Sequence, residues 1–200
     1  NRPTHLCKNC GYMFGNPQLT DEVHKKYYES FYRENDREFT IPDKEFYELE
    51  KHRGTEIINY LHSNKVLNDN NTCLDVGCGS GATSFIFANI FKNVIAIDLA
   101  NEYTKNVEKL DNLKVLNTTI QDSFFNKKKF GFINYCHVFD HLNDPLKEIK
   151  RIEEILDDNG YLYIEVPGIY HIDYWYKGNF FHSLETDHTH FFTLNTLKNF

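Results

Sequence analysis

The residues whose types and spacing could carry chemistry begin with two acids and a run of glycines. Asp75 ends a short apolar run and precedes three alternating glycines, Gly77, Gly79 and Gly81. Glycines allow positive φ and let a ligand approach the main chain, and a helix that follows them presents free backbone N–H groups. Asp98 ends a second apolar run, where an acid accepts hydrogen bonds from ribose hydroxyls. The pattern indicates a nucleoside site; the alternatives are a glycine turn of another kind of α/β domain and a helix-capping Asp98.

The spacing of the glycines narrows the class of ligand. A dinucleotide fingerprint reads G-x-G-x-x-G, whereas this turn is one residue tighter and carries an acid two positions before its first glycine. No Lys-Ser/Thr pair follows, which excludes a P-loop. The acid would repel a phosphate and suits a cationic ligand. An NAD-dependent oxidoreductase stays open as an alternative, although the tight spacing disfavours it.

A second group of chemical side chains lies in an aromatic and histidine-rich stretch near the end of the chain. His182, His188 and His190 belong to it, and histidine is the natural general base near neutral pH. We predict that the stretch walls an acceptor pocket and that His188 is the base, followed by His190 and His182. The alternatives are a structural role for each histidine and a metal site at positions 188 and 190. Within this stretch no H-x-x-x-H or H-x-x-E-H motif is present, so we predict no metal.

Alternating apolar runs and helical patterns must position these groups. After a first strand that leads into the glycine turn, strands are predicted at 93–97, 113–116, 130–135 and 161–166, and helices at 43–62, 82–91, 101–110 and 144–156. The last helix has a polar cap and Pro145 in its first turn, and Asn159-Gly160 is its predicted stop. The alternation predicts a doubly wound α/β domain with a mostly parallel sheet and helices on both faces.

The segment 74–81, L-D-V-G-C-G-S-G, resembles motif I of the class I S-adenosylmethionine-dependent methyltransferases. Residues 137–145 resemble the family's V-L-E-H-L-x-D-P segment, with Asp140 in place of Glu. The resemblance covers about residues 54–197 and implies a Rossmann-like sheet that binds S-adenosylmethionine and releases S-adenosylhomocysteine. The family sheet has seven strands, so five predicted strands imply that the last two are lacking from this chain. The cofactor contacts expected from the motifs and the resemblance are Asp75, Gly77, Gly79, Gly81, Asp98, Leu99, Asp122, Ser123, His137, Tyr28 and Tyr32.

Three regions are expected along the chain. Residues 1–18 contain Cys7 and Cys10 in a C-x-x-C-G pattern, which resembles the second half of the zinc ribbon that precedes many such methyltransferases. Two thiols cannot fill a tetrahedral shell, so we expect zinc only if an upstream half exists. Residues 19–53 are expected to form a helical cap over the cofactor, and residues 54–200 the methyltransferase domain.

Composition limits the function further. The net charge of -7 argues against a duplex nucleic-acid partner, and no apolar run is long enough to cross a membrane. An odd count of five cysteines without a secretory signal fits a reducing cytoplasm, and the richness in Asn, Lys and Ile suggests a bacterial source. We expect a small-molecule acceptor, with a hydroxyl of a sugar or nucleotide-linked metabolite methylated. A non-catalytic binding module and a zinc-ribbon interaction module stay open, as does the oligomeric state.

Overall fold

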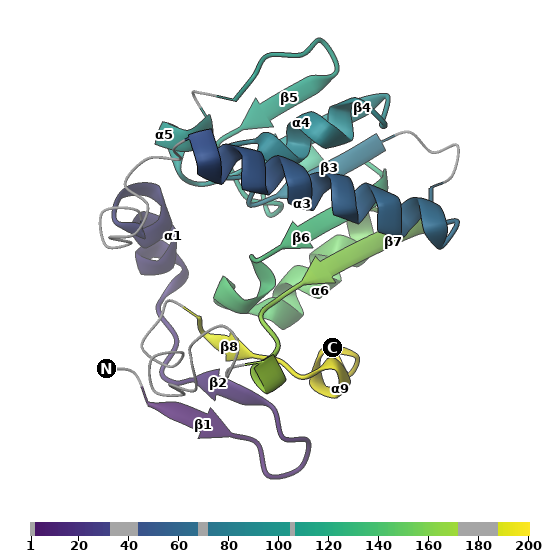
Figure 1. Ribbon diagram of the computed structural model, residues 1–200. Helices are drawn as coiled ribbons and strands as arrows, with labels where there is room; N and C mark the ends of the chain where they lie inside the picture. The colour runs from purple at the N-terminus through teal and green to yellow at the C-terminus, as the bar shows by residue number, and fades with distance from the viewer. Residues whose placement is uncertain (1–2, 33–43, 68–71, 105–106, 172–187) are drawn as a thin grey trace.

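A computed structural model describes residues 3–32, 44–67, 72–104, 107–171 and 188–200. Its centre is a five-stranded sheet in the order β5-β4-β3-β6-β7, and every neighbouring pair is parallel (Figure 1). The strands are β3 (Thr72–Val76), β4 (Asn93–Ile97), β5 (Leu113–Leu116), β6 (Phe130–Cys136) and β7 (Leu156–Glu165). The predicted doubly wound α/β class is therefore confirmed.

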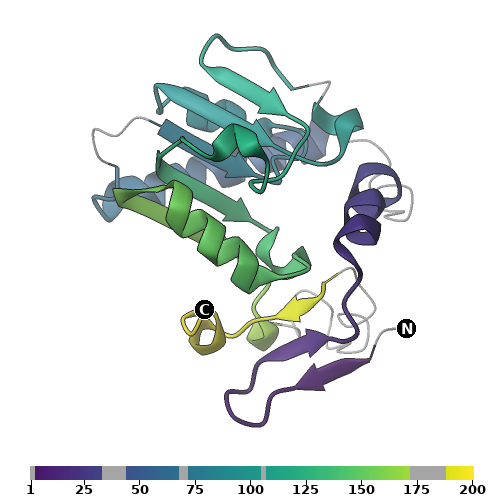
Figure 2. The ribbon, with the colours of Figure 1, turned by 180° about the vertical axis from the view of Figure 1, so that it is seen from behind.

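Successive residues of a strand point to opposite faces of the sheet. Both faces carry apolar side chains here, and helices cover each of them. Cys73 of β3 packs with α3 (Lys44–Ser63) and α4 (Ala82–Ala88), whereas its neighbour Leu74 packs on the other side with α6 (Pro145–Ile155). Figure 1 shows α3 in front of the sheet, and Figure 2, seen from behind, shows α6 there instead. Each face thus has its own apolar core, and the carboxyl ends of the strands stay open between them.

Two predicted helices are shorter in the structure, and the predicted stop signal of a third lies inside a strand. The helix predicted at 82–91 ends at Ala88, and among the described residues of the range 101–110 only Asn101–Thr104 are helical, as α5. The helix predicted at 144–156 has nearly its predicted bounds as α6, but Asn159-Gly160 does not stop it, because the chain is extended from Leu156, which pairs with Phe130 of β6. Gly160 lies inside β7, where an added Cβ would stand 2.8 Å from the carbonyl oxygen of Phe130. Close approach of β6, rather than a helix end, therefore requires this glycine.

The two ends of the described chain meet in a second, antiparallel sheet. It joins the hairpin of β1 (Thr4–Leu6) and β2 (Met13–Gly15) to β8 (His190–Phe191), in the order β1-β2-β8 (Figure 2). Cys7 and Cys10 lie in the turn between β1 and β2, where Gly11 N donates to the carbonyl oxygen of Cys7 at 2.9 Å. The hairpin is thereby attached to the segment that carries the predicted acceptor-site histidines.

The remaining elements are short. They are α1 (Asp21–Ser30), α9 (Leu194–Leu197) and three 3₁₀ turns, η1 (Ser123–Phe125), η2 (Phe139–His141) and η3 (Ile169–His171). Within the described ranges, the structure has no helix with the length and apolar character that a bilayer crossing requires.

Candidate active site

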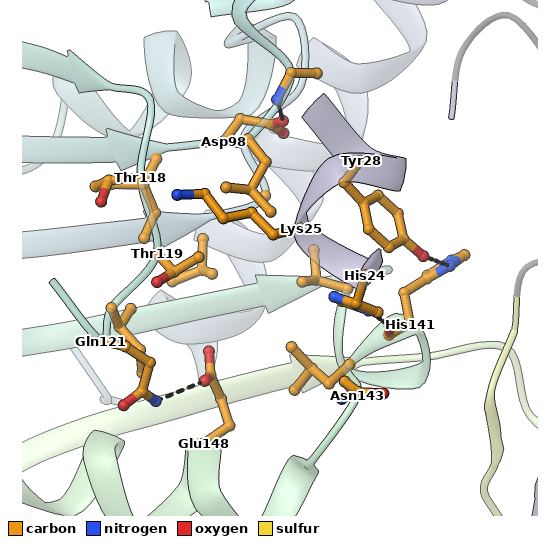
Figure 3. A pocket seen from close by; sticks show the side chains of 18 of the residues that line it. His24, Lys25, Tyr28, Asp98, Thr118, Thr119, Gln121, His141, Asn143 and Glu148 are labelled. Atoms are coloured by element: carbon orange, nitrogen blue, oxygen red, sulfur yellow. Dashed lines mark hydrogen bonds between the residues drawn. The ribbon is translucent and has the colours of Figure 1, made fainter. Parts of the chain in front are cut away.

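A cavity of about 390 Å³ opens at the carboxyl ends of β3, β4 and β6, the edge where ligands bind in sheets of this kind. Its walls are the glycine turn, the end of β4, the segment 118–121 and the segment that follows β6. The helix α1 closes it from the other side, as the close view in Figure 3 shows. Of the predicted cofactor contacts, the structure brings seven to this cavity: Gly77, Gly79, Asp98, Leu99, His137, Tyr28 and Tyr32.

The glycine turn has the backbone conformation that its sequence indicated. Gly77, Gly79 and Gly81 have φ values of 70°, 51° and 76°, which favour glycine over any other residue. At Gly77 space is limiting as well, because an added Cβ would lie 2.2 Å from Cγ2 of Val138. Gly81 lies outside the cavity lining and forms the N-cap of α4, packed under Val107.

Asp98 belongs to the cavity wall and also holds the glycine turn in place. Its Oδ2 accepts the backbone N–H of Gly79 at 2.9 Å, and its Oδ1 accepts that of Ala100 at 2.7 Å. Neither Gly79 nor Ala100 lies in a helix, so these bonds hold the turn and are not the helix cap considered as the alternative for this acid. A ribose that rested on Asp98 would also lie next to Gly79.

Asp75 lies outside the cavity, which corrects the expectation that it faces a ligand. Its carboxylate is only 2% exposed and accepts hydrogen bonds from the hydroxyl of Ser84 and, at 2.8 Å, from Nδ2 of Asn134. Burial raises the pKa of Asp75 to about 6, against these two bonds that lower it. The side chain fastens α4 and β6 to β3 beneath the glycine turn.

In the segment after β5 the cavity is lined by Gln121, and neither Asp122 nor Ser123 takes part in the lining. Asp122 caps η1, where its Oδ1 accepts the N–H of Phe124 at 2.7 Å. Gln121 instead donates from Nε2 to Oε2 of Glu148 at 3.1 Å (Figure 3). The sequence therefore predicted the correct loop but the wrong residue, Asp122 instead of Gln121. Which side chain points into the cavity depends on the conformation of the turn, which the sequence pattern does not give.

The helix α1 presents one aromatic and basic face to the cavity. His24 and Tyr28 are four residues apart and share a side of this helix, and Tyr32, just beyond the C-cap residue Phe31, also lines the cavity. The ring Nδ1 of His141 stands 3.1 Å from the Tyr28 hydroxyl, and the His24 ring Nε2 lies 2.9 Å from the His141 carbonyl oxygen (Figure 3). His24 and Lys25 were missed by sequence reasoning, although the spacing of His24 from Tyr28 was a usable signal.

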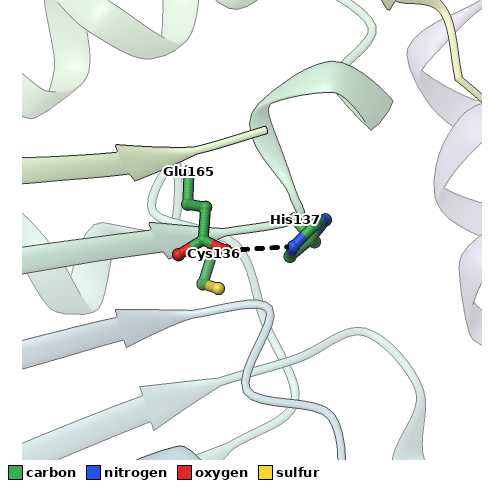
Figure 4. A group of neighbouring side chains, drawn as sticks. All are labelled: Cys136, His137 and Glu165. Atoms are coloured by element: carbon green, nitrogen blue, oxygen red, sulfur yellow. Dashed lines mark ion pairs between the residues drawn. The ribbon is translucent and has the colours of Figure 1, made fainter. Parts of the chain in front are cut away.

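His137 follows β6 with a φ of 55°, and its backbone N–H is bonded to the carbonyl oxygen of Glu165 at 2.8 Å. Its ring Nε2 lies 3.3 Å from Oε1 of Glu165 (Figure 4), and Tyr163 donates to the other oxygen at 2.7 Å. The His137 hydrogen bond is the main cause that lowers the pKa of Glu165 to about 2. The adjacent Cys136 has its pKa raised by burial. The carboxylate of Glu165 is therefore ionised, and both of its oxygens have a partner.

The predicted catalytic histidines separate in the structure. His182 lies outside the described residues. His190 is 5% exposed, and its ring is held by the hydroxyl of Tyr12 and the carbonyl oxygen of Leu142, so it fastens β8 in place. His188 lies behind the cavity wall, with its Nε2 3.2 Å from Oδ2 of Asp140.

Asp140 supplies the carboxylate partner that sequence reasoning did not find for His188. It lies on η2, 2% exposed, and Nε2 of His141 also stands 3.7 Å from its Oδ2. His141 in turn lines the cavity. His137 and His141 have the H-x-x-x-H spacing, a signal that lay outside the stretch expected to hold the catalytic histidines.

A parallel doubly wound sheet with a glycine turn and a ribose-type acid at one cavity defines the class of nucleoside-binding α/β proteins. The family model described as "Methyltransferase domain" matches residues 49–200. The chain therefore belongs to this methyltransferase family.

Two curated proteins are similar to parts of the chain. The chain is 27% identical over 148 residues to the uncharacterized protein MJ1252 of Methanocaldococcus jannaschii, covering 68% of this chain and 55% of that one. It is 29% identical over 107 residues to (S)-coclaurine N-methyltransferase of Papaver somniferum, covering 50% and 30%. The chain thus spans about half or less of the length of these curated relatives.

Among solved structures, the plantazolicin methyltransferase BpumL, in complex with a monoazolic desmethylPZN analog and SAH, superposes with a TM-score of 0.54. The identity is 20%, and the match covers 76% of this chain and 61% of that one. At this identity the likeness concerns the fold.

Proposed function

We propose that the protein transfers a methyl group from S-adenosylmethionine to a hydroxyl of a small polar acceptor, such as a sugar or a nucleotide-linked metabolite. The observation that carries the proposal is a single cavity that joins the glycine turn, Asp98 and a wall of histidines. Membership of the methyltransferase family supports the reaction class.

The cofactor is assigned to the part of the cavity between the glycine turn and α1. The backbone of Gly77 and Gly79 allows close approach, and Asp98 offers a carboxylate to the ribose. Tyr28 of α1 and Tyr32 beyond its end cover the ligand from the other side. SAH in the BpumL complex supports an S-adenosyl ligand for this fold.

The acceptor is assigned to the histidine end of the same cavity, where His24, His137 and His141 line the wall. Methyl transfer requires the acceptor oxygen to stand in line with the methyl carbon and the sulfur, and a hydroxyl must also lose its proton. His188 lies outside the lining but next to His141, with the two ring centroids 4.8 Å apart, and its Nε2 is 3.2 Å from Oδ2 of Asp140; we assign it to this end of the site. The variant His188→Ala is therefore expected to keep cofactor affinity and to lose turnover.

Calorimetric titration with S-adenosylhomocysteine and, separately, with NADH tests the cofactor assignment. Tight NADH binding without S-adenosylhomocysteine binding would replace the proposal by the oxidoreductase alternative. Incubation with labelled S-adenosylmethionine and a panel of nucleotide sugars then tests the acceptor. Cofactor binding with no transfer to any acceptor class would favour the non-catalytic binding module.

The thiols of Cys7 and Cys10 are candidate zinc ligands, separate from the cavity. Backbone N–H groups, that of Cys10 first, lower the pKa of Cys7 and so favour the thiolate that binds metals. We propose that this pair holds zinc only together with ligands from a further segment, as half of a ribbon. The free state of all five cysteines fits the proposed cytoplasmic setting.

A further inference from the structure

Asp140 is the most unusual polar group in the described part of the chain. Its side chain is 3% exposed, and neither of its carboxylate oxygens accepts a hydrogen bond from any described residue. A buried carboxylate without such partners is costly unless a cation neutralises it. The groups nearest to its Oδ2 are two imidazole nitrogens, Nε2 of His188 at 3.2 Å and Nε2 of His141 at 3.7 Å.

Asp140, His141 and His188 each offer one ligand atom, and these three atoms lie within 4.8 Å of one another. Bonds of about 2.0–2.2 Å to a divalent transition metal place neighbouring ligand atoms roughly 3–3.5 Å apart. The distances to Asp140 Oδ2 are close to that spacing. Two imidazoles and one carboxylate form the ligand set of the His₂Glu zinc sites and of the 2-His-1-carboxylate sites.

The surroundings of His141 fit a metal ligand as well. Its ring Nδ1 lies at hydrogen-bond distance from the Tyr28 hydroxyl; in the tautomer in which Nδ1 donates to this oxygen, the lone pair of Nε2, which stands 3.7 Å from Asp140 Oδ2, can bind a metal. A second hydrogen bond of this kind commonly fixes the tautomer and the orientation of a metal-bound histidine. The other group of possible ligands in the described chain, Cys136, His137 and Glu165, differs because its carboxylate is already partnered by Tyr163 and His137.

We propose that Asp140, His141 and His188 bind a divalent transition-metal cation at the histidine end of the cavity. Imidazole ligands favour the Mn²⁺ to Zn²⁺ series over Mg²⁺ and Ca²⁺, which prefer oxygen. The site has three protein ligands and borders the cavity through His141, so coordination positions remain for a small molecule. An acceptor hydroxyl would take one of these coordination positions, a step that rests on the proposed function. In this proposal His188 is a metal ligand and not the free base predicted from the sequence.

Zinc binding by the chelator-treated full chain tests the site. The Cys7→Ser and Cys10→Ser changes are made in every protein, so that the thiol pair cannot bind the probe. Calorimetry with ZnCl₂ should show a single tight site, and thermal unfolding should shift upward with ZnCl₂ but not with MgCl₂. Absence of a zinc-dependent shift would overturn the proposal and leave an Asp140–His188 ion pair as the explanation.

Ligand variants assign the site to these residues. Asp140→Asn keeps the side-chain volume, and both it and His188→Gln should weaken zinc binding by about 100-fold or more. Tyr28→Phe should weaken it by about tenfold, the lower end of the range for residues that orient a ligand. Unchanged zinc affinity, within about threefold, in both ligand variants would place the metal elsewhere and refute the site.

Two controls and one parallel measurement complete the experiment. His52→Gln removes an exposed histidine that stands 4.0 Å from the carboxylate of Glu56 on α3, and Cys136→Ser removes a thiol of the other ligand group; both should leave zinc affinity unchanged. S-adenosylhomocysteine affinity is measured on the same proteins. If the parent protein, with only the two cysteine changes, binds S-adenosylhomocysteine but not zinc, the metal site alone is refuted; if it binds zinc but not S-adenosylhomocysteine, the proposed function alone is refuted.

Discussion

Replacing Asp98 by alanine tests its proposed role in cofactor binding, beside the role within the protein that the structure shows. Within the protein it accepts two backbone N–H groups, at 2.9 Å from Gly79 and at 2.7 Å from Ala100. Its proposed second role is to accept a ribose hydroxyl of the cofactor in the same cavity. The first role contributes to the stability of the glycine turn, and the second contributes only to binding.

The expected size of the binding effect follows from the charge of the acceptor. A hydrogen bond to a charged group contributes about 1.5–3 kcal/mol, and each 1.4 kcal/mol is about a factor of ten in affinity. Asp98→Ala should therefore weaken S-adenosylhomocysteine binding about 10- to 100-fold. Isothermal titration calorimetry, at a temperature at which circular dichroism shows the variant to be folded, measures the loss.

Asp122 provides a matched control. Its Oδ1 accepts the N–H of the residue two positions later at 2.7 Å, as Asp98 Oδ1 does, but it lies outside the cavity lining. Asp122→Ala should cost about 1 kcal/mol of stability, the usual value of a cap, and leave cofactor affinity unchanged. Equal weakening by the two substitutions, or less than about threefold weakening by Asp98→Ala, would refute the assignment of Asp98.

Three further predictions concern stability. Burial raises the pKa of Asp75 from 3.8 to about 6; a raised folded-state pKa contributes stability that is present below about pH 4 and lost by pH 6, so relative to Asp75→Asn the protein should lose about 3 kcal/mol over that window in urea titrations. Gly77→Ala should lower the melting temperature more than Gly11→Ala, because both have positive φ but only the former meets a neighbouring side chain; equal shifts in calorimetric scans would show that the clash is relieved. Tyr12→Phe should cost about 1–2 kcal/mol in chemical denaturation by removing the hydroxyl partner of buried His190, and a neutral result would deny that contact a role in holding β8.

Short-range sequence patterns were enough for the centre of the molecule. The strands at Asn93–Ile97 and Leu113–Leu116 have the predicted bounds, because an apolar run between polar turns has little alternative to a buried parallel strand. The glycine turn was predictable for the same kind of reason. Its three positive φ values are a property of glycine itself, and the place of Asp98 next to it follows from the parallel pairing of β3 with β4.

Tertiary structure alone decided which polar side chains meet. Asp140 and His188 are 48 positions apart, and no local pattern indicates that the pairing of β8 with β2 and the position of η2 bring them to 3.2 Å. The place of Asn159-Gly160 inside β7 was also decided at long range, because the chain pairs with β6 from Leu156 onward, whereas the local pattern predicted a helix stop at these two residues. Local residue types thus determined the cofactor side of the cavity. The histidine side depends on contacts between distant segments, which form only in the folded chain.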